Sequence, residues 1–390
     1  MPHLKVVPFD SAQIEQKIAK SDMMEFHAKS LTSDDEVIGV KHENEEFLLQ
    51  IKPDSKATLL KYDKVTRPLK VNVLKEALGR VSDELTLDVL SSNIAISNST
   101  PILSSQYFKK IKDFENVVFP QKKVSVEVGF GSGRHLLYQA EKNPDTLFIG
   151  LEIHTPSAQQ VLKQIALQNI NNIWVVNYDA RLFLEMLPSN LCEQIFVHFP
   201  VPWDKKPNRR VISHSFLAES MRVLSQGGRL ELRTDSDKYF KYALETFFSL
   251  PQVEVEVRKN EALEVISKYE ARWRRQEKDI YDVYVKCKDL SQDKNIVLDF
   301  NFNIVKYKNN LENVLPKKPL VFDGYFVHFE RIYKTNNKKM LIKCAFGSFD
   351  RPEHKYILLD ETSCRYFVSE PVKTTVNHEA HTKIMELLNV

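Results

Sequence analysis

The spacing of apolar residues near the middle of the chain predicts a buried strand, a tight turn and then a helix. Valines occupy every second position of 124–128, and a period of two is typical of a strand. Glycines follow at 129, 131 and 133, and the next segment, 134–141, carries its apolar residues at helical spacing. The free N–H groups at the start of this helix are therefore expected next to the glycine turn.

Strand-like and helix-like segments continue to alternate after this turn. Apolar runs that predict strands lie at 146–152, 173–180 and 194–198, a fifth strand follows the glycines at 227–228, and a helix is expected over 157–167. Such alternation favours a mostly parallel sheet with helices on both of its faces. We therefore assign residues 121–290 to one α/β domain.

The segments on either side are predicted to form two smaller α+β domains, 1–120 and 291–390. The first has a polar link at 91–105 and a helix at 71–78, after strands at 36–40, 47–52 and 57–62. The last has a helix at 378–388, after strands at 296–307, 320–333, 340–349, 355–359 and 365–368. Lysines and aromatic residues in 291–390 are compatible with nucleic-acid contact, although aromatic residues in strands commonly belong to the core.

Acidic residues accompany the ends of three predicted strands. Glu127 lies two positions before the first glycine, Glu152 ends the second strand, and Asp179 ends the third. Ligands of open α/β sheets bind at the carboxyl ends of the strands, where an acid such as Glu152 is suited to hold ribose hydroxyls. The alternative is that these acids cap helix starts.

The glycine turn is a candidate site for a nucleotide-like ligand. Gly129, Gly131 and Gly133 lack Cβ atoms, so a ligand can lie against the backbone there. The dinucleotide fingerprint is disfavoured, because it requires glycine where Arg134 stands. A tight strand-to-helix connection without a ligand is the alternative interpretation.

The fourth strand runs into a loop rich in proline and basic residues. Prolines at 200, 202 and 207 stiffen this loop, and Trp203 offers a flat face. The basic residues are Lys205, Lys206, Arg209 and Arg210. This composition suits the docking of a base and its phosphates. The alternative is that Trp203 packs down as a lid and the cations keep the loop soluble.

Two further segments lie near the same predicted edge of the sheet. Thr234 and Asp235 follow the fifth strand, beside the crevice. Ser267–Glu270 precede the basic run Arg272–Arg275, which is a second candidate patch for phosphate contacts.

Composition sets limits but assigns no function. The formal net charge of +3 over 390 residues does not by itself indicate a nucleic-acid binder. No segment approaches the roughly 18 apolar residues that span a bilayer, and the four cysteines form no C-x-x-C pair. We expect a cytoplasmic protein without membrane contact or bound metal, either a monomer or a homodimer. A group of polar residues in the first domain is interpreted as a solvated edge: His27, His42, Glu43, Glu45 and Glu46.

Short motifs occur along the central domain in a distinctive order. They are Glu-Val-Gly-Phe-Gly-Ser-Gly (127–133), Gly-Leu-Glu-Ile-His (150–154), Asn-Tyr-Asp-Ala (177–180), His-Phe-Pro-Val-Pro-Trp-Asp-Lys-Lys (198–206), Asn-Arg-Arg (208–210), Thr-Asp (234–235) and Ser-Lys-Tyr-Glu (267–270). In this order they resemble the bacterial tRNA (guanine-N7-)-methyltransferase family over about 121–286. The proline-tryptophan-lysine loop is the specific part, since many methyltransferases share the glycine motif.

The resemblance implies a Rossmann-like class I methyltransferase core, S-adenosylmethionine as cofactor and tRNA as partner. It implies methyl transfer to N7 of a guanine in the tRNA variable loop. The three acids and three glycines named above then correspond to cofactor-binding residues. The implied substrate-binding residues are Lys205, Asp235, Ser267 and Glu270, with Ser267 in place of a family Thr, and Arg209 and Arg210 are the candidate phosphate contacts beside them.

One position departs from the family pattern Phe-Pro-Asp-Pro-Trp, because Val201 stands in place of its acid. Guanine N7 has a lone pair and no proton, so methylation there needs no general base. A carboxylate that holds the base as it becomes cationic is still favourable. We assign this role to Asp235, helped by Asp204, which is alternatively a surface charge paired with Lys205 or Lys206.

Three functions therefore stay open at this point. The first is methyl transfer to guanine N7 in tRNA. The second is an S-adenosylmethionine-dependent methyltransferase of another substrate. The third is a non-catalytic tRNA-binding relative, in which Val201 marks the loss of activity.

Overall fold

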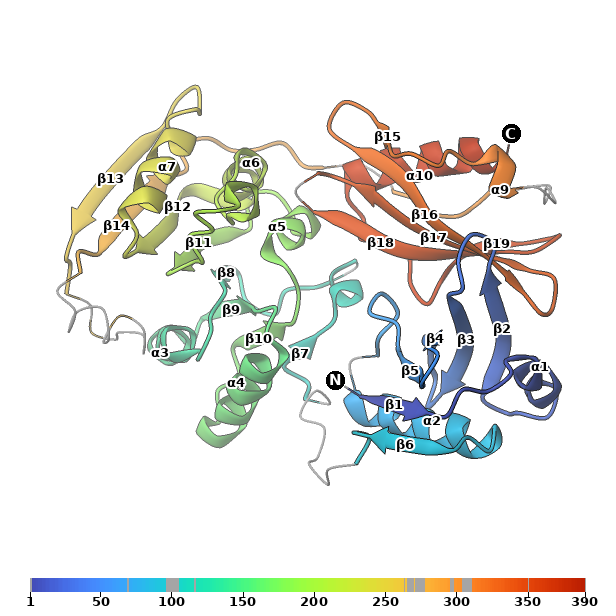
Figure 1. Cartoon of the computed structure of the whole chain (residues 1–390). Coiled ribbons are helices and arrows are strands. Elements are labelled where there is room, and N and C mark those ends of the chain that lie inside the picture. Colours follow the sequence, from blue (N-terminus) through green and yellow to red (C-terminus); the bar gives the residue numbers. More distant parts are fainter. Residues whose placement is uncertain are drawn as a thin grey trace. The chain divides into compact units, whose positions relative to one another are not determined.

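The computed structural model describes residues 2–68, 70–95, 105–115, 117–262, 264, 270, 278–294, 298–303, 311–349 and 351–389. The chain divides into two compact units, shown in Figure 1. One unit combines the two ends of the chain, Met1–Thr100 and Leu298–Val390, and the other is the middle, Pro101–Val297. No helix in these described ranges is long and apolar enough to cross a membrane.

The middle unit is built on a mostly parallel sheet with the strand order β13-β14-β12-β11-β8-β9-β10-β7. β14 pairs antiparallel with both β12 and β13, and the other pairings are parallel. The strands are β7 (Phe108–Lys109), β8 (Lys123–Val128), β9 (Thr146–Leu151), β10 (Ile173–Val176), β11 (Cys192–His198), β12 (Leu224–Thr234), β13 (Glu254–Lys259) and β14 (Tyr281–Lys286).

Helices cover both faces of this sheet. The valines of β8 share one apolar cluster with residues of α5 (Ala180–Phe183), α6 (His214–Val223) and α7 (Asp237–Phe247). The opposite face carries a second cluster, to which α3 (Arg134–Lys142) and α4 (Thr155–Gln168) contribute. The layering predicted for 121–290 is thus confirmed.

The two ends of the chain build an antiparallel sheet with the order β19-β18-β17-β16-β2-β3-β4-β5-β1-β6, and β15 pairs with β16. α2 (Val71–Glu84) packs on β1, β3 and β5, and α10 (Thr375–Leu388) lies against β16 and β17 (Figure 1). The other elements are β1 (His3–Val6), α1 (Ala12–Ile18), β2 (Met24–Ser30), β3 (Glu36–His42), β4 (Glu45–Lys52), β5 (Thr58–Tyr62), β6 (Val89–Ser92), α9 (Leu311–Val314), β15 (Leu320–Val321), β16 (Phe326–Thr335), β17 (Met340–Gly347), β18 (Pro352–Leu359) and β19 (Cys364–Phe367).

The pairing of β16 with β2 joins the two ends of the chain. Tyr333 lies opposite Ser30 in this pairing, and an apolar cluster that includes Phe26, Tyr333 and Phe367 spans it. The structure therefore differs from the expectation of separate domains at 1–120 and 291–390. A pairing between strands so far apart in the sequence leaves no local pattern in either segment.

Several individual elements also differ from the sequence expectations. The predicted strand at 296–307 has no regular secondary structure in its described residues, 298–303, and Phe300 there is buried in the core. The strands β1, β2, β6, β7, β13 and β14 were not predicted, and β6 overlaps the predicted polar link at 91–105. β13 is exposed along most of its length, although Val255 and Val257 alternate with charged residues there, a period of two that is typical of a strand.

The glycine turn generates a prediction about stability. Gly133 has φ +73°, and a Cβ atom there would lie 2.3 Å from Cγ2 of the buried Val161. Gly133→Ala is expected to lower the free energy of unfolding by about 1–2 kcal/mol for the left-handed backbone and by about 1–3 kcal/mol more for the overpacked core. Urea unfolding followed by circular dichroism measures this loss.

Gly129→Ala is the matched control for this prediction. Gly129 has φ +70°, but a Cβ atom there would meet nothing within 4 Å. Gly129→Ala is therefore expected to lower the free energy of unfolding by about 1–2 kcal/mol, which is the backbone cost alone. Equal losses for the two variants would contradict the packing argument.

A half-buried carboxyl in the middle unit generates a second prediction. Burial, and then the charge of Glu219, raise the pKa of Glu185 to about 7. The folded state therefore binds more protons than the unfolded chain between roughly pH 4.5 and 7, and stability falls as pH rises through that window. Glu185→Gln removes this dependence, so the variant gains stability over the wild type from pH 5 to pH 8, by about 3 kcal/mol at most.

Thermal or urea unfolding at pH 5 and pH 8 tests this expectation. Glu141→Gln, at an exposed position of α3, is the control for loss of one carboxylate. An equal stability difference between Glu185→Gln and the wild type at both pH values would show that Glu185 is not the titrating group.

Candidate active site

The candidate site lies at the carboxyl edge of the middle sheet. β8 and β11 are neighbours in the sheet, but the chain continues from β8 to β9 on one side and from β11 to β12 on the other. Such a switch point is where open α/β sheets form ligand sites. The glycine turn follows β8 and the proline loop follows β11, so both predicted site segments lie at this edge.

Left-handed backbone and a hydrogen bond to an acid that follows the next strand fix the conformation of the glycine turn. Gly129, Gly131 and Gly133 all have positive φ angles. The N–H of Gly131 donates to Glu152 Oε2 at 3.0 Å. A Cβ atom at Gly129 or Gly131 would meet no protein atom nearer than 3.9 Å. The backbone of the turn is therefore accessible to a ligand at these two positions.

Two of the predicted acids lie at adjacent strand ends. Glu152 follows β9 and also accepts from the N–H of His154 at 2.9 Å through Oε1. Asp179 caps α5, because its Oδ1 accepts from the N–H of Arg181 at 3.0 Å. Asn177 donates to the backbone oxygen of Glu152 at 2.5 Å. Glu152 and Asp179 thus follow the neighbouring strands β9 and β10, and Asp179 fulfils the alternative role of a helix cap.

The third acid, Glu127, lies in a buried row of charged and imidazole groups. Its Oε2 is 2.9 Å from Nδ1 of His135. The ring of His135 lies 4.4 Å from that of His198, centroid to centroid, and His198 Nε2 is 2.9 Å from Glu231 Oε1. Burial alone would raise the pKa of Glu231, but the hydrogen bond and charge of His198 outweigh it and lower that pKa.

A second buried group lies two residues further along β12. Arg233 is completely buried and pairs with Glu270, whose Oε1 is 2.8 Å away, and with Asp282. Burial alone would lower the pKa of Arg233, but the hydrogen bond to Glu270 and the charges of both acids outweigh it and raise that pKa. Glu270, predicted to bind substrate, is thus 1% exposed and engaged in an ion pair. Ser267 lies outside the described residues.

The proline loop combines exposed cations with one buried arginine. Lys205 and Arg209 are exposed, and the Arg209 guanidinium lies 5.2 Å from the centre of the Trp203 ring. Arg210 was predicted as a phosphate contact, but it is 7% exposed and donates to the backbone oxygen of Pro202 at 2.8 Å. Its guanidinium also lies 4.4 Å from the ring centre of Tyr242.

The two candidate catalytic carboxylates are partly exposed and each faces a cation. Asp235 Oδ2 lies 2.9 Å from Nζ of Lys278, and the Asp235 side chain is 18% exposed. Asp204 Oδ1 lies 3.6 Å from Nη2 of Arg210. The structure thus pairs Asp204 with Arg210, whereas the sequence suggested Lys205 or Lys206.

Sequence reasoning did not identify the partners that hold these acids. The residues concerned are His135, His198, Glu231, Arg233 and Asp282. A usable signal was present in β12, where charged residues alternate with leucines over 229–233. A central strand of a doubly wound sheet is expected to be apolar on both faces, so this alternation indicates a polar face.

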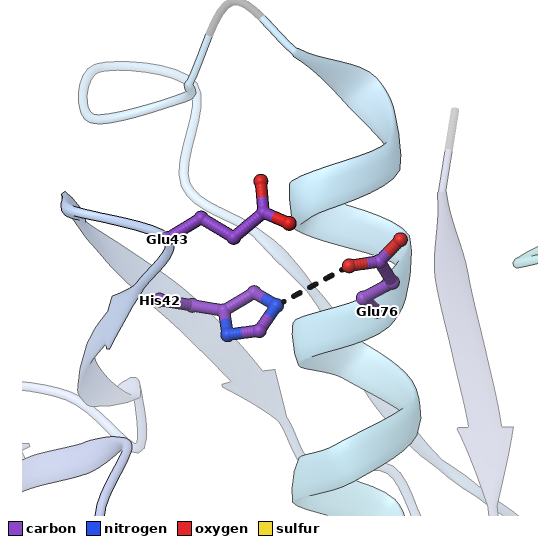
Figure 2. Close-up of side chains that lie close together, drawn as sticks. All are labelled: His42, Glu43 and Glu76. Atoms are coloured by element: carbon purple, nitrogen blue, oxygen red, sulfur yellow. Dashed lines mark hydrogen bonds and ion pairs between the residues drawn. The ribbon is translucent and has the colours of Figure 1, made fainter.

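Figure 2 shows a separate group of side chains in the unit built from the chain ends, formed by His42, Glu43 and Glu76. Their ligand-type atoms lie within 4.8 Å of one another, and His42 Nε2 is 3.4 Å from Glu76 Oε2. His27, which the sequence analysis grouped with His42, instead contacts Glu36 at 2.7 Å. His27 and His42 each lie within hydrogen-bond distance of a carboxylate. We assign no metal to the group in Figure 2.

Comparison with known proteins relates this chain to a protein family. Residues 121–283 match the family described as "Putative methyltransferase". Relatives from Wolinella succinogenes and Campylobacter jejuni are each 42% identical, over 91% of this chain and 91% of their own. A relative from Helicobacter pylori is 38% identical over 100% of this chain and 97% of its own. All three are named tRNA (guanine-N(7)-)-methyltransferase, and their similarity extends well beyond the segment 121–286 that carried the resemblance. The chain belongs to the tRNA (guanine-N7-)-methyltransferase family.

Proposed function

We propose that this protein transfers a methyl group from S-adenosylmethionine to N7 of a guanine in the variable loop of tRNA. The observation that carries the proposal is the similarity over 91–100% of the chain to relatives named tRNA (guanine-N(7)-)-methyltransferase. The residues at the carboxyl edge of the middle sheet support it, because they suit both a nucleoside cofactor and a nucleotide substrate.

The residues around the glycine turn fit the proposed cofactor. Open space at Gly129 and Gly131 leaves room for its nucleoside against the backbone. Glu152 and Asp179 are suited to its ribose hydroxyls and adenine edge, and Glu127 provides a negative charge for its cationic methionine amine. When bound, the cofactor supplies an electrophilic methyl group on a sulfonium sulfur.

The protein's own task in this reaction is to orient the base and to accommodate charge. N7 attacks with its lone pair as the sulfur–carbon bond breaks and the sulfur keeps that electron pair, so no proton has to be removed. The purine gains a positive charge, which a preorganised carboxylate stabilises. We assign Asp235 to the guanine N1–H and exocyclic amine, where it also fixes the orientation of the base, and Asp204 to the same negative environment.

The proline loop supplies the phosphate contacts in this proposal. Lys205 and Arg209 are exposed on a loop stiffened by proline, and Trp203 beside Arg209 offers a face to an unstacked base. We assign Arg210 a different role from the one predicted by sequence. Because its guanidinium is buried against Tyr242 and bonded to the Pro202 oxygen, it holds the loop in shape.

Incubation of the purified protein with S-adenosylmethionine and unmodified tRNA tests the function. We expect a single new N7-methylguanine in the variable loop, detected by nucleoside mass spectrometry and located by cleavage at that base. Methylation of another substrate would move the assignment to a different methyltransferase. Cofactor binding without any product would favour the non-catalytic tRNA-binding alternative.

Asp235→Asn tests the assigned carboxylate. The amide is close in size but carries no charge, so kcat/KM for tRNA is expected to fall about 100-fold, with the fold intact by circular dichroism. Asp237→Asn is the matched control. Its carboxylate is 53% exposed and pairs with Lys241 one helical turn away, and little change in rate is expected. Full activity and unchanged tRNA affinity in Asp235→Asn would sink the assignment.

A further inference from the structure

The row of side chains behind the glycine turn suggests how cofactor affinity is controlled. We propose that His135 is a positioning residue for Glu127, which it holds at the mouth of the turn, and that protonation of His135 weakens cofactor binding by neutralising that carboxylate. The inference rests on the proposed function, because it takes Glu127 as the acid that attracts the cofactor's cationic amine.

The geometry gives His135 direct control over Glu127. His135 lies in the first turn of α3, two residues after Gly133, so the element that receives the ligand also carries the imidazole. Its Nδ1 is 2.9 Å from Glu127 Oε2. The side chains of His135 and Glu127 are only 12% and 4% exposed, so water competes little for this bond and screens it weakly.

The groups that face His135 come from four elements. Glu127 lies on β8, Gln139 on its own helix at 3.1 Å, His198 on β11, and Glu231 and Arg233 on β12. His198 and Glu231 are already bonded to each other at 2.9 Å. His135 therefore has Glu127 as its direct carboxylate partner, and a positive charge on its ring is shared chiefly with that acid.

The charge state of His135 sets the net charge of the Glu127–His135 pair. A neutral imidazole donates its Nδ1 proton and leaves Glu127 with a full negative charge. A protonated imidazole forms an ion pair with Glu127, so the pair is neutral overall and attracts a cationic amine less strongly. Burial alone would lower the pKa of His135, but the charge and hydrogen bond of Glu127, with the charge of Glu231, outweigh it and raise that pKa.

A cavity adjoins this row of side chains. His135, Gln139 and Glu231 line a cavity of about 490 Å³ among the described residues. The rings of His135 and His198 are 4.4 Å apart, centroid to centroid. Because the pKa of His135 is raised above its usual 6.5, the ring is expected to lose its proton at a higher pH than an unperturbed imidazole.

Calorimetric titration of the full-length protein with S-adenosylhomocysteine tests the inference without any catalytic turnover. For the wild type, affinity is expected to rise about tenfold from pH 6 to pH 8 as His135 loses its proton. His135→Asn places an amide donor near the Nδ1 position but cannot be protonated, so its affinity is expected to stay flat over this range. His135→Ala loses the donor and is expected to bind more weakly at pH 8 than the wild type.

His214→Asn is the matched control, because His214 lies at the start of α6 and contacts Ser249. It is expected to keep the wild-type pH profile. A flat wild-type profile, or a pH slope retained in His135→Asn, would overturn the role of His135 while leaving cofactor binding established. If the wild type bound no S-adenosylhomocysteine at any pH, both this inference and the proposed function would fall.

Discussion

The carboxyl edge of the middle sheet depends on the pairing of one buried cation. Arg233 is completely buried in β12, and an unpaired guanidinium there would cost several kcal/mol. Glu270 and Asp282 supply the compensating charges. The backbone oxygen of Arg233 also accepts from the N–H of Phe199 at 2.7 Å, where the proline loop begins. The ion pairs therefore link β12 to β14 and to Glu270. The backbone hydrogen bond links β12 to the start of the proline loop.

This network belongs to a sheet whose two faces differ in character. One face of β8, β11, β12 and β14 is apolar and packs against helices, whereas the alternate positions include the charged and imidazole groups Glu127, His198 and Glu231. Glu231 and Arg233 are two residues apart on β12, so they lie on the same face. The row that holds Glu127 and the network that holds Glu270 thus share one strand, and the proposed cofactor and substrate sides of the crevice have a common rigid support.

Local sequence patterns predicted the features that depend on residues close together in the chain. The glycine turn and the acids Glu152 and Asp179 followed from alternating apolar residues and from where strands end. The link between Glu127 and His135 was missed, because a side-chain contact between a strand and the next helix leaves no periodic signal. The pairing of Tyr333 with Ser30 was missed for the same reason at longer range. The assigned roles in catalysis and substrate binding stay predictions, since they concern ligands.

We expect Val201 to affect the rate of the proposed reaction more than the conformation of the proline loop. The Val201 side chain is 60% exposed, so no packing requires an apolar residue at this position. The loop conformation depends instead on Arg210, which bonds the Pro202 oxygen and packs on Tyr242. By the resemblance to the family pattern, Val201 thus replaces an acid at an exposed position of this loop. Since the purine becomes cationic only as the methyl group is transferred, we expect any loss in the chemical step, for which we propose that Asp235 and Asp204 supply negative charge.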